Sequence, residues 1–181
     1  MKAFLKKLWH VDENIRFRMN LAKRCYRLPA IGRFVGMYMD RTLLWDYGLD
    51  VRSDTVDVAH LSISHPSGVL LGGNGIVSRG RVAIMSGVKF VGRHPHDPEY
   101  LRRHKERSVF RLGDNVMIGA NSVIVGPVDI CDNVAIAAMS LVNRSITEPG
   151  LYVGTPVRRV KDEVEDVWVE HLPRPAPAAD A

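Results

Sequence analysis

The sequence predicts a mainly β protein, a solenoid of very short strands, for three reasons. Aliphatic residues recur at every sixth position between Leu112 and Val142. Small or aliphatic residues recur with the same period four places further along each unit, and Gly, Asp and Asn lie between the two sets. A period of six fits neither a helix of about 3.6 residues per turn nor a strand with simple alternation. It fits short strands that are joined by tight turns and stacked in coils, with one aliphatic residue of each unit pointing inward. The first set is Leu112, Ile118, Ile124, Ile130, Ile136 and Val142, and the second is Val116, Ser122, Val128, Val134, Ser140 and Ile146.

Residues 1–47 precede the repeat and are predicted to be helical. Asp12 or Asn14 is expected to cap a helix that runs to Tyr26, and a second helix is expected over about residues 31–44. Two interpretations of this segment are open. The helices either cover the open end of the first coil, which a solenoid needs, or present a basic amphipathic surface to an anionic membrane. We favour the covering role, because a polar outer face is usual for a surface helix.

The repeat is predicted to occupy residues 48–161, with one long interruption. Its upstream units are less regular, and the period slips at residues 79–81. Residues 93–108 are polar and charged and cannot be stacked inside a coil, so they are expected to form an extruded loop, a feature that often carries function. Residues 162–181 are interpreted as a C-terminal tail, whose Pro- and Ala-rich end is typical of disorder.

Length and charge limit the classes of function. The chain of 181 residues suits one domain, and a net charge of +5 with a pI near 9.4 favours anionic partners such as phosphorylated ligands or an acidic membrane. Charge alone also permits nucleic acid, but no nucleic-acid partner is expected. The two cysteines, Cys25 and Cys131, show no paired motif, which fits a reducing compartment.

The beginning of the chain bears on its location. No apolar run is long enough to cross a bilayer, and the basic, amphipathic residues 1–9 lack the features of a signal peptide. The expected location is the cytoplasm or the inner face of the membrane, with a peripheral membrane contact through this basic N-terminal segment.

Three stretches of the repeat resemble a known family. The hexad run, with the closing residues 154–160 (Gly-Thr-Pro-Val-Arg-Arg-Val), resembles the left-handed β-helix acyltransferases. Residues 61–91 are similar to the serine O-acetyltransferase branch and its capsule and polysaccharide relatives. Residues 93–99 resemble both that branch and the maltose, galactoside and Nod-factor acetyltransferases. Over residues 48–161 the resemblance implies a left-handed parallel β-helix, acetyl transfer from acetyl-CoA, and a homotrimer with active sites between subunits.

The predicted chemistry needs a base for the hydroxyl proton and donors for the tetrahedral oxyanion. Histidine is the natural base near neutral pH, and a carboxylate behind it fixes its tautomer. His65 follows Asp50 by fifteen residues, close to the three hexads of one coil, so the two can lie side by side on adjacent coils. The His–Asp pair of the serine acetyltransferases has this spacing, and the resemblance carries its roles onto His65 and Asp50. The alternative is that both are solvated turn residues.

His94 is a second candidate for the base. Sugar acetyltransferases keep their catalytic histidine at this place before the loop, whereas serine acetyltransferases keep a substrate-binding Arg-His pair, matched here by Arg93 and His94. The two templates imply two histidines facing one cleft. We expect His65 to be the base, with His94 binding the acceptor or serving as the alternative base; by the plainer interpretation His94 is a charged loop residue.

Ser64 departs from the serine-enzyme pattern. Those enzymes carry an acidic residue here, which pairs with the amino group of serine, and its loss removes the counter-charge for an ammonium group. Ser64 is therefore expected to contact a sugar acceptor instead. We predict an acetyl-CoA-dependent O-acetyltransferase that acts on a hydroxyl of a sugar or surface polysaccharide, with serine O-acetyltransferase as the alternative.

Binding of the donor needs a narrow path for the pantetheine arm and fixed cations for the phosphates of coenzyme A. Small residues in the later coils suit the arm, and basic residues cluster past the last regular unit, where relatives place Lys or Arg against the nucleotide. Taken singly, each small residue could simply suit a tight turn, and each basic residue could be a solvated cation. This plainer explanation accounts less well for the whole set. The resemblance implies donor contacts at Gly119, Ala120, Ala138, Ser140, Asn143, Arg144, Arg158 and Lys161.

Two further classes of function stay open. The γ-carbonic anhydrases share the β-helix, and His60, His65 and His94 could form a three-histidine zinc site. However, those enzymes place the isolated histidine before the spaced pair and lack the closing motif with its cations. No metal is therefore expected. The other class is a non-catalytic β-helix that serves as an assembly scaffold.

Overall fold

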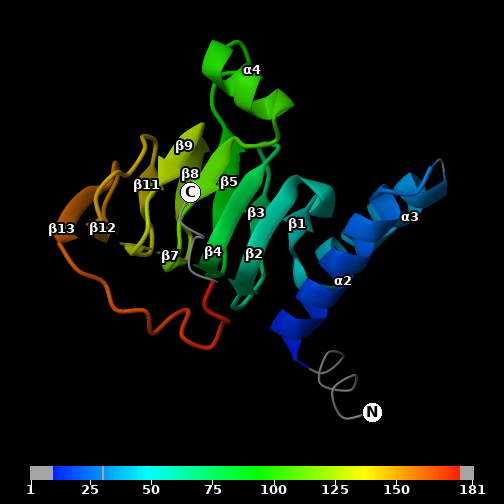
Figure 1. Cartoon of the computed structure of the whole chain (residues 1–181), viewed down its shortest axis with the longest axis horizontal. Helices are drawn as coiled ribbons and strands as arrows, with labels where there is room; N and C mark the ends of the chain where they lie inside the picture. Colours follow the sequence, from blue (N-terminus) through cyan, green and yellow to red (C-terminus); the bar gives the residue numbers. More distant parts are fainter. Residues whose placement is uncertain (1–9, 30, 176–181) are drawn as a thin grey trace.

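The computed structural model describes residues 10–29 and 31–175, and Figure 1 shows two helices beside a coil of short strands. The helices are α2 (Val11–Tyr26) and α3 (Ile31–Tyr47), and a further helix, α4 (Pro98–Lys105), interrupts the strands. The predicted mainly β fold with N-terminal helices and an extruded loop is confirmed. The strands are β1 (Asp50–Val51), β2 (Val56–Ile63), β3 (Leu70–Leu71), β4 (Ile76–Ile84), β5 (Lys89–Gly92), β6 (Phe110–Leu112), β7 (Val116–Ile118), β8 (Val123–Gly126), β9 (Val128–Ile130), β10 (Val134–Ile136), β11 (Leu141–Val142), β12 (Gly150–Val153) and β13 (Arg158–Lys161).

The strands form three faces of a parallel coil. The first face is β1, β3, β5, β8 and β11. The long strands β2 and β4 span two faces: the start of β4 pairs with β6, which pairs with β9, on the second face. The end of β4 pairs with β7 on the third face, which continues through β10 and β12 to the antiparallel β13. Asn115 and Asn133 lie eighteen residues apart on neighbouring coils and share a side-chain hydrogen bond of 2.9 Å.

The inward residues of the hexads form the core, as the repeat predicts. Ile118, Ile124, Ile136 and Val142 have no exposed surface, and the rest of the first set are at most 6% exposed. The second set is equally buried, and the hydroxyl of its Ser122 donates to the carbonyl oxygen of Ala137 at 2.9 Å. Apolar burial therefore comes from stacking coil on coil, and no coil could provide it alone.

Helices α2 and α3 cover the open end of the first coil (Figure 1). Ile15 and Met19 of α2 and Leu43 of α3 belong to the same buried cluster as Val51 and Val56 of the first coil. These contacts agree with the covering role that we favoured for the helical segment.

The predicted N-terminal cap of α2 is wrong. Asp12 and Asn14 lie inside α2, which begins after His10 without a side-chain cap. The Asp12 carboxylate instead accepts a hydrogen bond of 2.9 Å from the backbone N–H of Ile63, the last residue of β2. The carboxylate thus joins α2 to the coil, a long-range role that no local pattern indicates.

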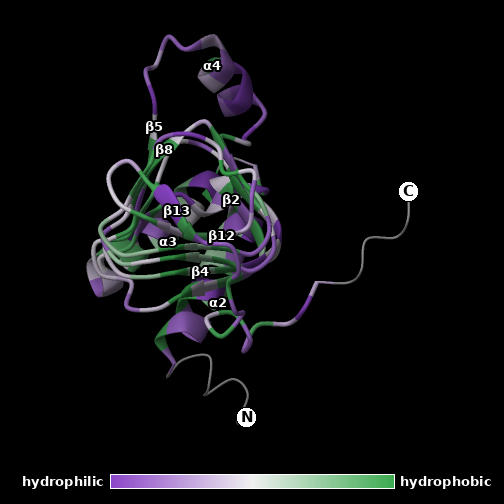
Figure 2. Cartoon of the chain, turned by 90° about the vertical axis from the view of Figure 1, so that its left-hand side faces the viewer, coloured by the Kyte–Doolittle hydropathy of each residue, from purple (hydrophilic) through white to green (hydrophobic). Residues whose placement is uncertain are grey.

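The loop over residues 93–108 is extruded as predicted, but it contains helix α4. Figure 2 shows α4 standing out from the coil, with mostly hydrophilic residues. Asp97 caps α4 by accepting from the N–H groups of Glu99 and Tyr100, and Pro98 is its first residue. Arg103 fixes α4 to β9 through two contacts with the Asp129 carboxylate, at 2.6 and 2.9 Å.

Part of the predicted C-terminal tail is packed against the third face. Val169 and Leu172 are buried against Ala83, and Asp166 contacts Arg81 at 3.0 Å. Residues 162–175 therefore run along the coil, whereas residues 176–181 lie outside the described part of the chain.

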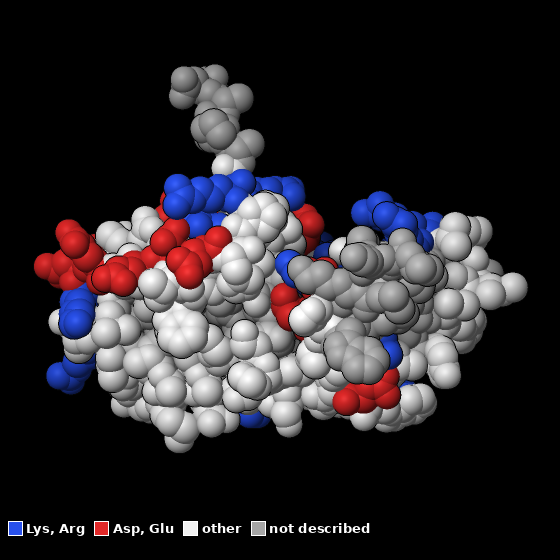
Figure 3. All heavy atoms as spheres, turned by 90° about the horizontal axis from the view of Figure 1, so that it is seen from below, with Lys and Arg blue, Asp and Glu red and all other residues white. Residues whose placement is uncertain are grey.

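The length of the helices and the distribution of surface charge are relevant to membrane contact. Within residues 10–29 and 31–175, no helix combines the length and apolar character needed to cross a bilayer. The basic segment 1–9, which was predicted to touch the membrane, lies outside the described residues. On the face seen in Figure 3, Lys and Arg gather in separate patches instead of covering the surface.

Candidate active site

The turns between the third and first faces stack into one edge of the coil, here called the third–first edge. It consists of residues 64–69, 85–88, 119–122 and 137–140, and the turn between β12 and β13, residues 154–157, stacks on the last of these. Backbone hydrogen bonds join these turns, from Gly87 to the carbonyl of Ser67 at 3.0 Å and from Met139 to the carbonyl of Ala120 at 2.8 Å. The predicted base and several predicted donor contacts therefore lie along one edge.

His65 is an exposed turn residue at this edge. Its φ of +57° is left-handed, a conformation in which Asn, Asp and His are enriched among residues other than glycine. The turn leaves the His65 side chain exposed at this edge.

Asp50 lies on the coil next to the His65 turn. The backbone N–H of Gly68 donates to the carbonyl of Gly48 at 3.0 Å, and that of Asp50 donates to Val69 at 2.9 Å. The two segments are thus neighbours, as the spacing predicts. Across the described residues, however, no hydrogen bond or ion pair joins the Asp50 and His65 side chains, so their pairing stays a prediction.

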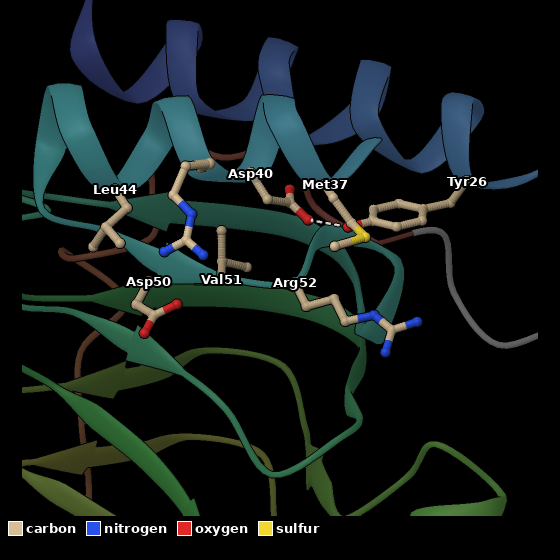
Figure 4. Close-up of a pocket in the computed structure, with 8 residues that line it drawn as sticks. Tyr26, Met37, Asp40, Leu44, Asp50, Val51 and Arg52 are labelled. Atoms are coloured by element: carbon tan, nitrogen blue, oxygen red, sulfur yellow. Dashed lines mark hydrogen bonds between the residues drawn. The ribbon is translucent and has the colours of Figure 1, made fainter. Parts of the chain in front are cut away.

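Asp50 also borders a hollow of about 190 Å³ between α3 and β1 (Figure 4). In Figure 4 its carboxylate points away from Asp40, which accepts a hydrogen bond of 2.7 Å from the Tyr26 hydroxyl. Burial raises the pKa of Asp40, although hydrogen bonds from Ser53 and Tyr26 oppose that effect. Asp40 therefore fixes α3 to the first coil, whereas exposed Asp50 stays accessible.

Ser64 immediately precedes the predicted base. Its backbone N–H donates to the carbonyl of Ile84 at 2.9 Å, and the side chain is half-buried. The position at which the resemblance to the serine enzymes leads one to expect an acidic residue thus lies at the third–first edge with an uncharged side chain.

Four of the predicted donor contacts follow one another along the same edge. Gly119 and Ala120 lie one coil before Ala138, and Arg158 pairs with Val153 on the coil after it. A Cβ atom on Gly119 would lie 2.5 Å from the backbone nitrogen of Ala138, so only glycine permits this approach of the coils. Ala138 and Arg158 are exposed, so this edge offers small side chains followed by a cation.

Two other predicted donor contacts are placed less directly. Ser140 is buried, and its hydroxyl accepts from the Gly154 backbone N–H at 3.2 Å, which gives it a structural role. Lys161 lies at the far end of β13, paired with Leu151. The contacts of both with a donor stay predictions.

The remaining predicted residues lie at the edge between the first and second faces, here called the first–second edge. Arg93 donates from its guanidinium to the carbonyl of Asn143 at 2.6 Å, a contact that no local sequence signal indicates. Arg144 follows Asn143 and is exposed. His94 lies at the start of the loop, where its Nδ1 accepts from the His96 backbone N–H at 3.3 Å.

The two candidate histidines therefore lie at different edges of one chain. His65 is on the third–first edge and His94 on the first–second edge. Two edges of one coil do not meet, so a cleft that holds both histidines requires two chains.

The three histidines of the zinc alternative lie in different parts of the fold. His60 lies in β2, and the other two lie at the two edges. Among the residues that the structure describes, no group of three or more His, Cys, Asp or Glu side chains is arranged to hold a metal ion.

Comparison with known proteins agrees with this architecture. Residues 111–144 match the model of the bacterial transferase hexapeptide family, described as six repeats. The chain is similar in structure to serine acetyltransferase from Neisseria gonorrhoeae, with a TM-score of 0.73 and 22% identity over 89% of this chain and 59% of that one. It is also similar to soybean serine acetyltransferase in complex with serine, with a TM-score of 0.67 and 20% identity over 86% of this chain and 60% of that one. A serine acetyltransferase in complex with CoA gives a TM-score of 0.65 and 19% identity over 86% and 60% of the two chains.

The chain spans about three-fifths of the length of these solved structures. At such identities the likeness concerns the fold. The chain therefore has the left-handed parallel β-helix of the hexapeptide-repeat acyltransferases that its sequence resembles.

Proposed function

We propose that the protein is an acetyl-CoA-dependent O-acetyltransferase that acts on a hydroxyl of a sugar or surface polysaccharide. The observation that carries the proposal is the third–first edge, where His65 lies in line with the small residues Ala120 and Ala138 and the cation of Arg158. A base, a narrow path and a phosphate-binding cation along one edge are what acyl transfer from a thioester requires.

In the proposed reaction, His65 takes the proton of the acceptor hydroxyl as its oxygen attacks the thioester carbonyl. The tetrahedral intermediate then collapses, the carbon–sulfur bond breaks, and the imidazolium returns the proton to the departing thiolate. Asp50 would orient the imidazole and stabilise its charged form. His94 is the alternative base, and Arg93, His94 and Ser64 would contact the acceptor.

Donor binding rests on the other predicted residues. The pantetheine arm would lie along Gly119, Ala120 and Ala138, whose side chains are small, beside the exposed Met139. Arg158 would bind a phosphate, because a guanidinium presents a fixed fork of donors. Ser140, Asn143, Arg144 and Lys161 are proposed as further contacts.

A homotrimer would complete the site. Because His65 and His94 lie at different edges, a neighbouring chain must supply one of them if they share a cleft. A trimer that places the third–first edge of one chain against the first–second edge of the next supplies both, together with Arg93, Asn143 and Arg144. The proposed location is the cytoplasm, with the basic residues 1–9 at the inner face of the membrane.

Two acceptors compete. The solved structures are serine acetyltransferases, one of them in complex with serine, and this likeness favours the alternative, serine O-acetylation. The uncharged Ser64 favours a sugar, because an ammonium group would have no carboxylate partner at that position.

The test is an acceptor panel of free serine, monosaccharides and oligosaccharides, with release of the CoA thiol as the readout. We expect a saccharide to support turnover above thioester hydrolysis and Ser64→Asp to raise the turnover of serine relative to that sugar. Turnover with serine alone would favour the alternative. No turnover with any acceptor, despite CoA binding, would support a non-catalytic scaffold.

A further inference from the structure

Helix α3 packs on the rest of the protein through its small residues. Its buried residues are Gly32, Gly36, Asp40 and Leu43. A Cβ atom on Gly32 would lie 2.4 Å from the carbonyl oxygen of Cys25, and one on Gly36 would lie 2.9 Å from the ring of Tyr26. The inner side of α3 thus has little room for large apolar side chains.

The opposite side of α3 carries the large apolar residues. Ile31, Phe34, Tyr38 and Trp45, here called the outer face of α3, are 77%, 73%, 63% and 66% exposed. Their spacing of three, four and seven residues places them on one side of a helix, and the Tyr38 and Trp45 rings lie 6.2 Å apart. A surface helix normally buries such residues, so within residues 10–29 and 31–175 this face is an exposed apolar surface.

Helix α3 carries two arginines beside its outer face. Arg33 and Arg41 of α3 are exposed and form no ion pair with any described residue. The two acidic residues of α3 do not offset them, because Asp40 is buried in hydrogen bonds to Tyr26 and Ser53, and Asp46 pairs with Arg18.

We infer that the outer face of α3 docks on the surface of an anionic lipid bilayer. Aromatic and aliphatic side chains would enter the boundary between head groups and acyl chains, and the two arginines of α3 would bind the anionic head groups. Tyr and Trp suit this boundary because each joins an apolar ring to a polar atom. A second copy is a poorer occupant, because face-to-face pairing would bring the arginines of both copies together.

Docking would orient the rest of the molecule. Met37 and Arg41 of α3 line the same hollow as Asp50 (Figure 4). A bilayer against α3 would therefore hold Asp50 close to the lipid surface. This consequence for catalysis rests on the proposed function, whereas the docking itself does not.

The test is sedimentation of the full-length protein with vesicles of phosphatidylcholine alone or mixed with phosphatidylglycerol. We expect binding only to the mixed vesicles, weakening as salt screens the charges. Phe34→Ser with Trp45→Ser should weaken binding about tenfold or more, and Arg33→Ser with Arg41→Ser about fivefold for each arginine. The matched controls, Val153→Ser with Val160→Ser and Arg102→Ser with Lys105→Ser, alter exposed residues elsewhere and should leave binding unchanged.

A fluorescence measurement reports on the docked face directly. In a variant with Trp9→Phe and Trp168→Phe, the emission of Trp45 should shift to the blue when mixed vesicles are added. The inference is overturned if the wild-type protein binds neither vesicle, or if binding survives the α3 substitutions and is lost on Lys6→Ser with Lys7→Ser. It is also overturned if the outer-face substitutions change only the oligomeric mass. None of these outcomes depends on acetyl transfer, so the docking and the proposed function can fail separately.

Discussion

Single residues at the turns decide what the coil can do. Left-handed turn residues include Asn121, Asn133 and His65, which are residue types that this conformation favours after glycine. The Asp50–His65 spacing correctly predicted neighbouring segments, because the pitch of the coil is fixed by the repeat. It could not predict side-chain orientation, which depends on rotamers and on neighbouring chains.

Arg81 is a residue whose importance the sequence did not indicate. Its guanidinium is 7% exposed and contacts the Asp114 carboxylate at 2.7 Å and Asp166 at 3.0 Å. It lies where the hexad period slips, next to Gly80, so it appeared as part of a defect in the repeat. The hydrogen bonds from Arg81 hold the pKa of Asp114 below its usual value.

We predict that Arg81→Met lowers the free energy of unfolding by about 2 kcal/mol at neutral pH, because it leaves Asp114 partly buried without its partner. The pKa of Asp114 is lower in the folded protein than in the unfolded chain. The contact therefore contributes fully to stability above the unfolded-state pKa of about 3.9, and this contribution is lost as the pH falls through the folded-state pKa. The difference in the free energy of unfolding between the wild-type protein and Arg81→Met should therefore become smaller in acid. Urea titrations at fixed protein concentration measure it, with Arg79→Met, whose side chain is 88% exposed, as the control. A difference that does not change with pH would contradict this role.

At the scale of elements, periodic segments were predictable and irregular ones were not. The hexads from β6 to β11 give the buried residues directly, because each repeat places the same position inward. Helix α4 was missed, although Asp97 followed by Pro98 is a usual start of a helix. The packing of Val169 and Leu172 on Ala83 was also missed, since a short aperiodic segment gives no sign of what it contacts.

Arg103 is the anchor of α4. It is 6% exposed, and hydrogen bonds from it hold the pKa of Asp129 below its usual value. We predict that Arg103→Met speeds amide hydrogen exchange in α4, because the helix loses its attachment to β9, while the amides of β10 exchange as before. Arg102→Met, which removes only an exposed contact with Glu106, is the control. Unchanged exchange in α4 would show that other contacts hold the loop.

At the scale of the whole molecule, the predicted site residues are divided between two edges of one coil. The sequence predicted which residues face outward at turns, but their distribution over two edges follows from the coil as a whole. His65 lies with Ala138 and Arg158, and His94 lies with Asn143 and Arg144. If the two histidines share one cleft, this separation requires an assembly of chains. The helical end of the molecule, with the outer face of α3, lies at the other end of the coil from β12 and β13 (Figure 1).

The most direct measurement of the central claim is the turnover of acetyl-CoA by His65→Asn. Asparagine tolerates the left-handed turn, as Asn121 and Asn133 show, so this variant should keep its stability and its affinity for CoA while it loses the base. We predict that kcat falls by about 10²- to 10⁴-fold, whereas His96→Asn in the exposed loop retains full turnover. Wild-type turnover in His65→Asn, or its loss only in His94→Asn, would contradict the assignment of His65 as the base.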